Sequence, residues 1–339
     1  MEMRTLGRTG VMVSPLCLGA MMFGEWGNGD PDASVRIIHR ALDAGINFID
    51  TADVYSHGES EEIVGRALAG RRESVVLATK FHGVMGEDLN ERGNSRRWII
   101  REVENSLRRL RTDWIDLYQV HRPEDDTDIE ETLGALTDLV RAGKVRYIGS
   151  STFPASQLVE AQWVSRERRL ERFVSEQPPY SILERGIESD VLPTCLRHGV
   201  GVIPWSPLAG GWLSGRYRLG AEQPASSRRE RVPGRFDLST PGNQAKLEAA
   251  DALGALADES GHTLIEIALA WVIRHPAVTA AIVGPRTLEH LESMLPAVEL
   301  ELDDALLDRI DAIVPPGMNA NATDSGYQNP ALAPAARRR

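Results

Sequence analysis

Four side chains of types that serve proton transfer follow three consecutive apolar segments of the chain: Asp50, Tyr55, Lys80 and His121. An acid, a phenol, an ammonium group and an imidazole suit chemistry at a carbonyl oxygen that becomes an alcohol. A phenol is a weak acid, but an ammonium group a few ångströms away stabilises the phenolate. We expect Asp50 to hold Lys80 in its charged form. Tyr55 would then be the proton donor, and His121 would hydrogen-bond the substrate oxygen.

Each of these residues alone has a simpler explanation. An aspartate after a strand is often a turn or cap residue, and a tyrosine often packs in a core. A lysine at such a place is often exposed, and a loop histidine often makes only a local hydrogen bond. The combination at three consecutive segment ends favours an active site. A class I aldolase is an alternative, in which Lys80 forms a Schiff base with the substrate, although the nearby Asp50 favours an ammonium over a free amine.

The segments that must position these side chains alternate along the chain. Short apolar runs without polar alternation are typical of parallel strands covered on both faces, and a stretch with helical spacing follows each of them. We expect strands at 13–19, 46–50, 74–80, 114–120, 145–150, 172–177, 200–206 and 279–284. We expect helices at 33–44, 60–69, 96–110, 129–142, 154–168, 187–198 and 244–274, with Asp128 capping one of them and Gly261 dividing the last.

Eight such repeats predict an α/β fold, a single (β/α)8 TIM barrel over residues 1–314. A doubly wound sheet is less well supported, because no G-x-G-x-x-G follows a predicted strand. Residues 3–13 predict a β-hairpin at the bottom of the barrel. Residues 209–243, after the seventh strand, are too long for an ordinary connection and predict a lid with little core of its own. We expect residues 315–339 to be a loosely ordered tail.

Composition restricts the classes of partner. The chain of 339 residues carries 38 Lys and Arg against 49 Asp and Glu, a net charge of −11, which disfavours nucleic acid as a partner. It contains no apolar leader and no uninterrupted apolar stretch of about 18 residues, so we expect no membrane span and a cytoplasmic location. Two cysteines provide neither a disulfide framework nor metal-ligand spacing.

The segment GINFIDTADVYSHGESEEIVGRAL (45–68) resembles the aldo-keto reductase superfamily, whose G-x-x-x-x-D-T-A-x-x-Y-x-x-G-x-S-E-x-x-x-G-x-A-L pattern it follows position by position. Further similar segments are LATK (77–80), IDLYQVH (115–121), GKVRYIGSS (143–151), EQPPYS (176–181), PWSPLAGGWLSGRY (204–217) and IVGPRT (282–287). The resemblance, to the long-loop bacterial branch, covers about 5–315. It implies the same barrel, NADPH-dependent reduction of aldehydes or ketones, and a catalytic tetrad in which Tyr55 is the general acid.

The resemblance also implies which residues contact the cofactor. Those near the nicotinamide and its ribose are Ala20, Met21, Asp50, Ser151, Gln177 and Trp205. Those near the pyrophosphate are Ser206, Leu208, Gly210 and Arg216, and those near the adenosine phosphate are Gly284, Arg286 and His290. The chain departs from the family at Thr152, where Asn is usual, and at His290 and Met294, where a Gln and an Asn usually meet the adenine.

The expected substrate pocket has aromatic walls. Besides Tyr55 and the 209–243 segment, its residues are Met22, Phe23, Trp26 and His82. These walls carry few fixed charges and suit small neutral carbonyl compounds, whether simple aldehydes, ketones or keto-sugars. Because the long loop is also similar to that of the channel-associated branch of the superfamily, a cofactor-binding regulatory subunit with little turnover remains a further alternative.

Overall fold

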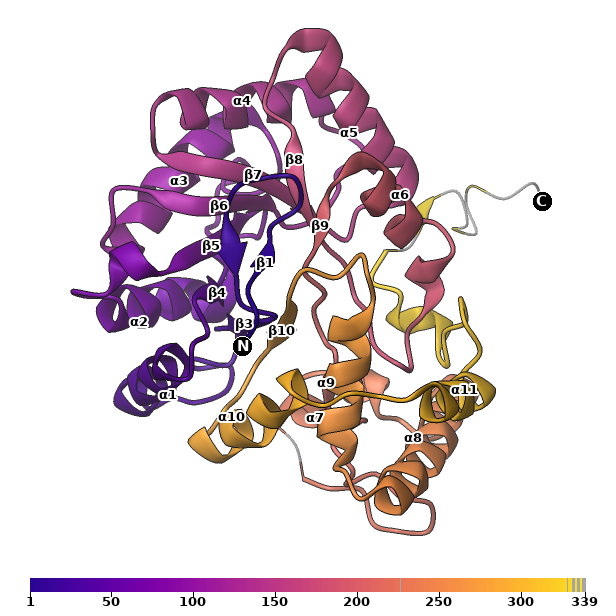
Figure 1. Cartoon of the computed structure of the whole chain (residues 1–339). Helices are drawn as coiled ribbons and strands as arrows, with labels where there is room; N and C mark the ends of the chain where they lie inside the picture. Colours follow the sequence, from indigo (N-terminus) through magenta and orange to yellow (C-terminus); the bar gives the residue numbers. More distant parts are fainter. Residues whose placement is uncertain (226, 328, 331–332, 334–335, 337–339) are drawn as a thin grey trace.

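A barrel of parallel strands forms the centre of the molecule (Figure 1). The computed structural model describes residues 1–225, 227–327, 329–330, 333 and 336, and within them eight parallel strands pair in the order β10-β3-β4-β5-β6-β7-β8-β9. They are β3 (Leu16–Gly19), β4 (Phe48–Asp50), β5 (Val76–Phe81), β6 (Ile115–Val120), β7 (Val145–Ser151), β8 (Phe173–Gln177), β9 (Gly201–Val202) and β10 (Ala281–Val283).

The two edges of this sheet meet. The amide of Val202 in β9 donates to the carbonyl of Ala277 (3.2 Å), and the amide of Thr279 donates to the carbonyl of Val202 (2.8 Å). Beyond them, the amide of Ile282 in β10 donates to the carbonyl of Pro204 (2.9 Å). The predicted α/β barrel is thereby confirmed, although the seventh strand is regular over only two residues.

Helices cover the outside of the barrel or lie in the segments that connect its elements. They are α1 (Pro31–Asp43), α2 (Glu59–Ala67), α3 (Arg96–Leu110), α4 (Ile129–Arg141), α5 (Ala155–Arg168), α6 (Val191–His198), α7 (Ser227–Arg231), α8 (Pro241–Ser260), α9 (Leu264–Arg274), α10 (Leu288–Met294) and α11 (Asp304–Ile313). Asp128 caps α4 as predicted, and Gly261, with a φ of +75°, ends α8 ahead of α9. In the part of the chain that the structure describes, no helix is both long enough and apolar enough to cross a bilayer.

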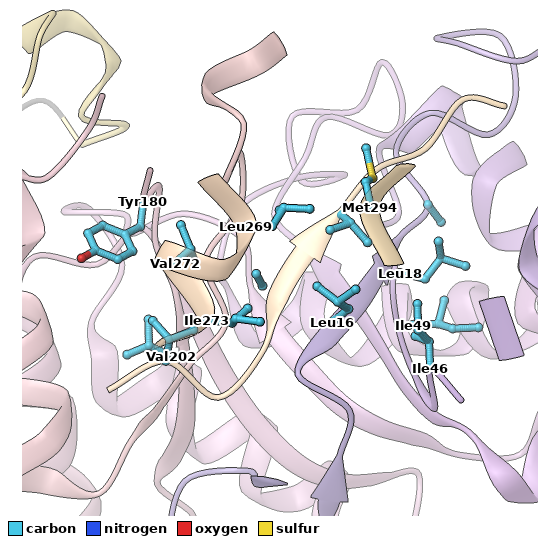
Figure 2. Close-up of a cluster of buried hydrophobic side chains, with 14 of the residues drawn as sticks. Leu16, Leu18, Ile46, Ile49, Tyr180, Val202, Leu269, Val272, Ile273 and Met294 are labelled. Carbon is cyan, nitrogen blue, oxygen red and sulfur yellow. The ribbon is translucent and has the colours of Figure 1, made fainter. Parts of the chain in front are cut away.

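Alternate residues of β3 face two different cores. Leu16 and Leu18 belong to a large cluster between the strands and the helices, whereas Cys17 belongs to a smaller cluster inside the barrel. Figure 2 shows part of the large cluster, in which both leucines join side chains of α9 and α10. Burial on both faces explains why the strands appear in the sequence as unbroken apolar runs.

The predicted amino-terminal hairpin is present as β1 (Arg4–Thr5) paired antiparallel with β2 (Met12–Val13). Leu6 and Val13 are fully buried in the cluster inside the barrel. The amide of Arg8 donates to the carbonyl of Gly199, just before β9, at 3.1 Å. The hairpin therefore covers the end of the barrel at which the strands begin, and leaves their carboxyl ends open to other loops.

Two segments differ from the sequence expectations. The 209–243 segment contributes to the large core, because the buried rings of Trp212, Tyr217 and Phe236 belong to it and pack with centroids 4.5 to 6.1 Å apart. The first part of the expected loose tail is attached to the barrel. The amide of Ala320 donates to the carbonyl of Leu183, and Asp324 pairs with Lys246 of α8 at 2.6 Å. A sequence pattern of Ser, Arg, Pro and Gly gives no sign of such long-range contacts.

Candidate active site

Three neighbouring strands carry the predicted tetrad at their carboxyl ends. Asp50 is the last residue of β4, Lys80 lies near the end of β5, and His121 directly follows β6. Nζ of Lys80 lies 2.5 Å from Oδ2 of Asp50 and 2.7 Å from the carbonyl oxygen of Thr51. It also lies 3.3 Å from the hydroxyl of Tyr55, which stands in the turn after β4. The structure thus brings all four residues to one end of the barrel, the end at which TIM barrels place their active sites.

Lys80 is fully buried and remains charged. Burial lowers the pKa of Lys80, but the opposing effects of Asp50 and Tyr55 outweigh it, so that the pKa lies above its ordinary value. A Schiff base requires a neutral amine. This charge state therefore argues against the aldolase alternative.

Two amides hold the carboxylate of Asp50 from the side opposite Lys80. Nε2 of Gln119 donates to Oδ1 of Asp50 at 3.0 Å, and Nε2 of Gln177 donates to the same oxygen at 2.9 Å. Gln119 was not predicted, although it lies two residues before the predicted His121 and therefore on the same face of β6. These contacts fix the orientation of the carboxylate that fixes Lys80.

His121 faces the phenol of Tyr55. Their ring centroids lie 5.7 Å apart with the planes nearly perpendicular. Burial, followed by the nearby charges of Lys80, Arg122 and His82, lowers the pKa of His121 well below its ordinary value. The ring is therefore a neutral imidazole at neutral pH and has one N–H to donate.

The predicted pocket residues do not all lie at the surface of the site. The ring of Trp26 lies 6.1 Å from that of Tyr55, and Nδ1 of His82 lies 2.9 Å from Oδ1 of Asn94. Met22 is partly exposed, whereas Phe23 is fully buried in the large core and does not line an open pocket. A similar difference holds for the predicted ribose contacts, because Ala20 is buried and Met21 is partly exposed.

Arg122, which was not predicted from the sequence, lies at the side of the site formed by Ser151 and Thr152. Nη1 of Arg122 donates to the hydroxyls of Ser151 (3.3 Å) and Thr152 (3.1 Å), and Oγ of Ser151 donates to the carbonyl of Gln177 (2.9 Å). Thr152 has a φ of +62°, a strained value for a β-branched residue, of the kind found at functional sites. The sequence contained one indication of this role, because Arg122 directly follows the predicted His121.

A buried carboxyl group supports the strained turn from behind. Glu176 accepts hydrogen bonds from Oγ of Ser150 (2.5 Å) and from the amide of Phe153 (3.0 Å). Burial, only partly offset by these hydrogen bonds, raises the pKa of Glu176 to about 7. Glu176 was also missed, although it directly precedes the predicted Gln177.

Residues expected at the pyrophosphate surround a second missed arginine. Nη2 of Arg228, in α7, lies 3.5 Å from Oγ of Ser206, and Gly210 approaches the same side chain. Burial, then Arg235 and Arg231, lowers the pKa of Arg228 to about 10. Among the described residues, no carboxylate oxygen lies within 4 Å of its guanidinium nitrogens. A desolvated cation without a paired anion is suited to binding a phosphate group.

The residues expected near the adenosine phosphate also gather together. Burial, followed by the charges of Arg286 and Arg216, lowers the pKa of His290, so both arginines lie within electrostatic range of this ring. Nδ2 of Asn28 donates to the carbonyl of Arg286 (3.0 Å), which ties this group to the loop after β3. Gly284, after β10, is exposed. Arg216 is exposed as well and contacts Ser214 rather than Ser206.

Two expected cofactor contacts remain, one at the nicotinamide and one at the pyrophosphate. Trp205 and Leu208 are both partly buried, and the amide of Trp205 donates to the carbonyl of Pro178 at 2.9 Å. Gly326, from the carboxyl-terminal segment, lies so close that a Cβ there would approach Trp205 at 3.2 Å and Thr152 at 3.1 Å. Among the described residues, no three His, Cys, Asp or Glu side chains are arranged to hold a metal ion.

The structure places more charge near the site than the sequence expectation of few fixed charges in the pocket. Burial is the main cause that lowers the pKa values of Arg122, Arg228 and Arg231, and an opposing effect of Tyr55 on each of them indicates that these three guanidinium groups lie within electrostatic range of that side chain. Two of them come from the long loop, whose spatial path the sequence does not indicate.

Comparisons with known proteins found similar sequences over most of the chain. The model of the Aldo/keto reductase family matches residues 15–315. The uncharacterized oxidoreductase YrpG of Bacillus subtilis (strain 168) is 43% identical over 327 residues, which cover 93% of this chain and 96% of YrpG. A probable voltage-gated potassium channel subunit beta of Arabidopsis thaliana is 35% identical, with 93% and 97% covered. Versiconal hemiacetal acetate reductase of Aspergillus parasiticus is also 35% identical, with 89% and 94% covered. The chain therefore belongs to the aldo/keto reductase family of oxidoreductases.

Proposed function

We propose that this protein is an NADPH-dependent reductase that converts aldehydes or ketones into alcohols. The observation that carries the proposal is the contact of Nζ of Lys80 with the hydroxyl of Tyr55 at 3.3 Å, opposite the neutral ring of His121. A phenol beside a buried ammonium group and an imidazole is an arrangement for giving a proton to an oxygen.

NADPH, when bound, supplies a hydride to the carbonyl carbon. The neutral imidazole of His121 donates its N–H to the carbonyl oxygen and orients it toward Tyr55. As negative charge develops on that oxygen, Tyr55 transfers its phenolic proton to it. Lys80 stays protonated throughout, because Asp50 lies 2.5 Å away, and it stabilises the phenolate that remains. Solvent then restores the proton on Tyr55.

The proposed cofactor site lies along the rim of the barrel, and three groups of residues contact successive parts of the cofactor. Ser151, Gln177 and Trp205 hold the nicotinamide end, near Ala20, Met21 and Asp50. Ser206, Leu208, Gly210 and Arg228 hold the pyrophosphate, with Arg216 at its edge. Gly284, Arg286 and His290 hold the adenosine phosphate. The lack of a carboxylate partner for Arg228 among the described residues supports an anionic ligand there.

A regulatory role is the second candidate, because a relative at 35% identity is named a channel subunit. The decisive experiment is NADPH consumption by the purified protein with a panel of aldehydes, ketones and keto-sugars, with Tyr55→Phe as the control. We expect turnover that the Tyr55→Phe variant loses. Tight NADPH binding without oxidation across the whole panel would overturn the reductase and support the regulatory role.

A further inference from the structure

Arg122 offers two unused donors at the proposed active site. Its Nη1 is occupied by the carbonyl of His121 (2.6 Å) and by the hydroxyls of Ser151 and Thr152. In the described part of the chain, Nε and Nη2 make no hydrogen bond, and neither is among the buried polar atoms that lack a partner. These two nitrogens form one edge of the guanidinium and are open to a ligand. Such an edge binds a carboxylate through two parallel hydrogen bonds.

The charge of Arg122 is not neutralised by an ion pair. No carboxylate oxygen of a described residue lies within 4 Å of its guanidinium nitrogens. The acid that affects it, Glu176, is already bonded to Ser150 and Phe153. A partly buried guanidinium without a counter-ion costs stability, so its presence beside His121 favours a role in binding.

A second arginine lies near the proposed site. Cζ of Arg231 lies 5.2 Å from the ring centroid of Trp26, whose ring lies 6.1 Å from that of Tyr55. Cζ of Arg122 lies 5.9 Å from the ring centroid of Trp205. Two aromatic side chains near the proposed site thus each have a guanidinium beside them, in a chain whose net charge is −11. Such a local positive field attracts anions and raises their rate of association.

The phosphates of the cofactor do not account for Arg122. Arg228 and Ser206 serve the proposed pyrophosphate position, and Arg286 serves the adenosine phosphate. Arg122 instead contacts Ser151, which is proposed to lie at the nicotinamide end of the cofactor. The nicotinamide group of NADPH carries no negative charge. The edge formed by Nε and Nη2 of Arg122 is therefore available to the substrate, the other molecule that this site must hold.

We propose that the carbonyl substrate carries a carboxylate and that Arg122 binds it through Nε and Nη2, while Arg231 contributes long-range attraction. This inference rests on the proposed reductase function and narrows it to acidic aldehydes or ketones. The substrate carbonyl lies between Tyr55 and His121, and its carboxylate extends toward the neighbouring Arg122.

The test compares two probes of nearly equal shape, 4-carboxybenzaldehyde and methyl 4-formylbenzoate, at equal ionic strength. We expect kcat/KM of the wild type to favour the acid over the ester by about 10- to 150-fold, the range of a charge-assisted pair. Arg122→Gln should bring this ratio close to one, mainly through the KM of the acid. Arg122→Lys, which keeps the charge and loses the paired donors, should give an intermediate ratio.

Arg146→Gln is the matched control, because Arg146 is exposed at the other end of β7, and its ratio should equal that of the wild type. A wild-type ratio near one, or an Arg122→Gln ratio equal to that of the wild type, overturns the inference and leaves the reductase intact. A second measurement does not depend on turnover. Calorimetry with 4-(hydroxymethyl)benzoate and its methyl ester, on protein saturated with NADP⁺, should show the same preference and the same loss. If neither aldehyde is reduced, the panel of carbonyl compounds described above decides the reductase proposal separately, and calorimetry still decides whether Arg122 binds a carboxylate.

Discussion

Oδ1 of Asp50 lies 2.9 Å from Nε2 of Gln177, although 127 positions separate the two residues. The same carboxylate holds Lys80 through its other oxygen. The group that fixes the charge beside Tyr55 is therefore also bonded to a residue proposed to contact the nicotinamide. The side-chain amide nitrogen of Gln177 donates to Asp50. Its side-chain carbonyl oxygen therefore remains to accept a hydrogen bond from the carboxamide of the nicotinamide.

Replacing Tyr55 by Phe removes the proposed proton donor and keeps the ring that faces Trp26 and His121. We expect kcat to fall by at least about 100-fold, the lower range for loss of a general acid. The affinity for NADPH, measured by fluorescence titration, should change little. Turnover close to that of the wild type would contradict the mechanism.

Replacing Lys80 by Met should abolish reduction and also destabilise the fold. The variant leaves the carboxylate of Asp50 buried without a cation, which costs about 3 kcal/mol of unfolding free energy. Asp50→Asn should be milder. The double variant, which combines Asp50→Asn with Lys80→Met, no longer buries an unpaired charge and should recover part of the lost stability in urea titrations. No recovery would mean that the two groups do not act as a pair.

Arg228 should control the release of NADPH more strongly than Arg216. Arg228 lies beside Ser206 and Gly210, whereas Arg216 is exposed and contacts Ser214. We expect Arg228→Ala to speed release, measured by stopped-flow fluorescence, by about tenfold or more, the effect of one charge-assisted bond. Arg216→Ala should have a smaller effect. Equal rates for both variants and the wild type would show that this loop does not retain the cofactor.

Arg286 should select NADPH over NADH. A guanidinium fits the oxygens of the additional phosphate, so Arg286→Ala should weaken NADPH by about 10- to 150-fold and leave NADH nearly unchanged. The alternative is a surface pair with Glu289 or Glu292, and of these two Glu292 already pairs with Arg40 at 2.7 Å. If binding titrations show both cofactors weakened equally, or a wild-type preference for NADH, the assignment is wrong and His290 becomes the candidate.

Glu176 should make stability fall as the pH rises. Burial raises the pKa of Glu176 from an ordinary value of 4.5 to about 7, so the folded state binds this proton more tightly than the unfolded state does. Stability is therefore lost between about pH 4.5 and pH 7, by about 3 kcal/mol. The Glu176→Gln variant has no carboxyl group at this position, so its stability does not depend on this protonation. The difference in unfolding free energy between wild type and variant should shift accordingly between about pH 4.5 and pH 7, and parallel curves would refute the prediction.

The sequence predicted what depends on local pattern. The strand-end placement of Asp50, Lys80 and His121 follows from apolar runs, because parallel strands of a barrel deliver their carboxyl ends to one rim. It did not predict Arg122, Arg228 or Glu176 as parts of the site. Their positions depend on the strained turn at Thr152 and on the path of the long loop, which are set by tertiary contacts between segments far apart in the chain.

The attachment of residues 318–324 to the barrel has an evolutionary consequence. Met318 and Ala320 are bonded to the loop after β8, and Asp324 to α8, so that Gly326 lies against Trp205. This piece of wall is encoded outside the alternating strands and helices. Insertions, deletions or exchanges there can reshape the mouth of the site while the barrel and its tetrad stay intact. Natural selection can therefore diversify the chemistry of this protein by changing a short segment that is not part of the barrel.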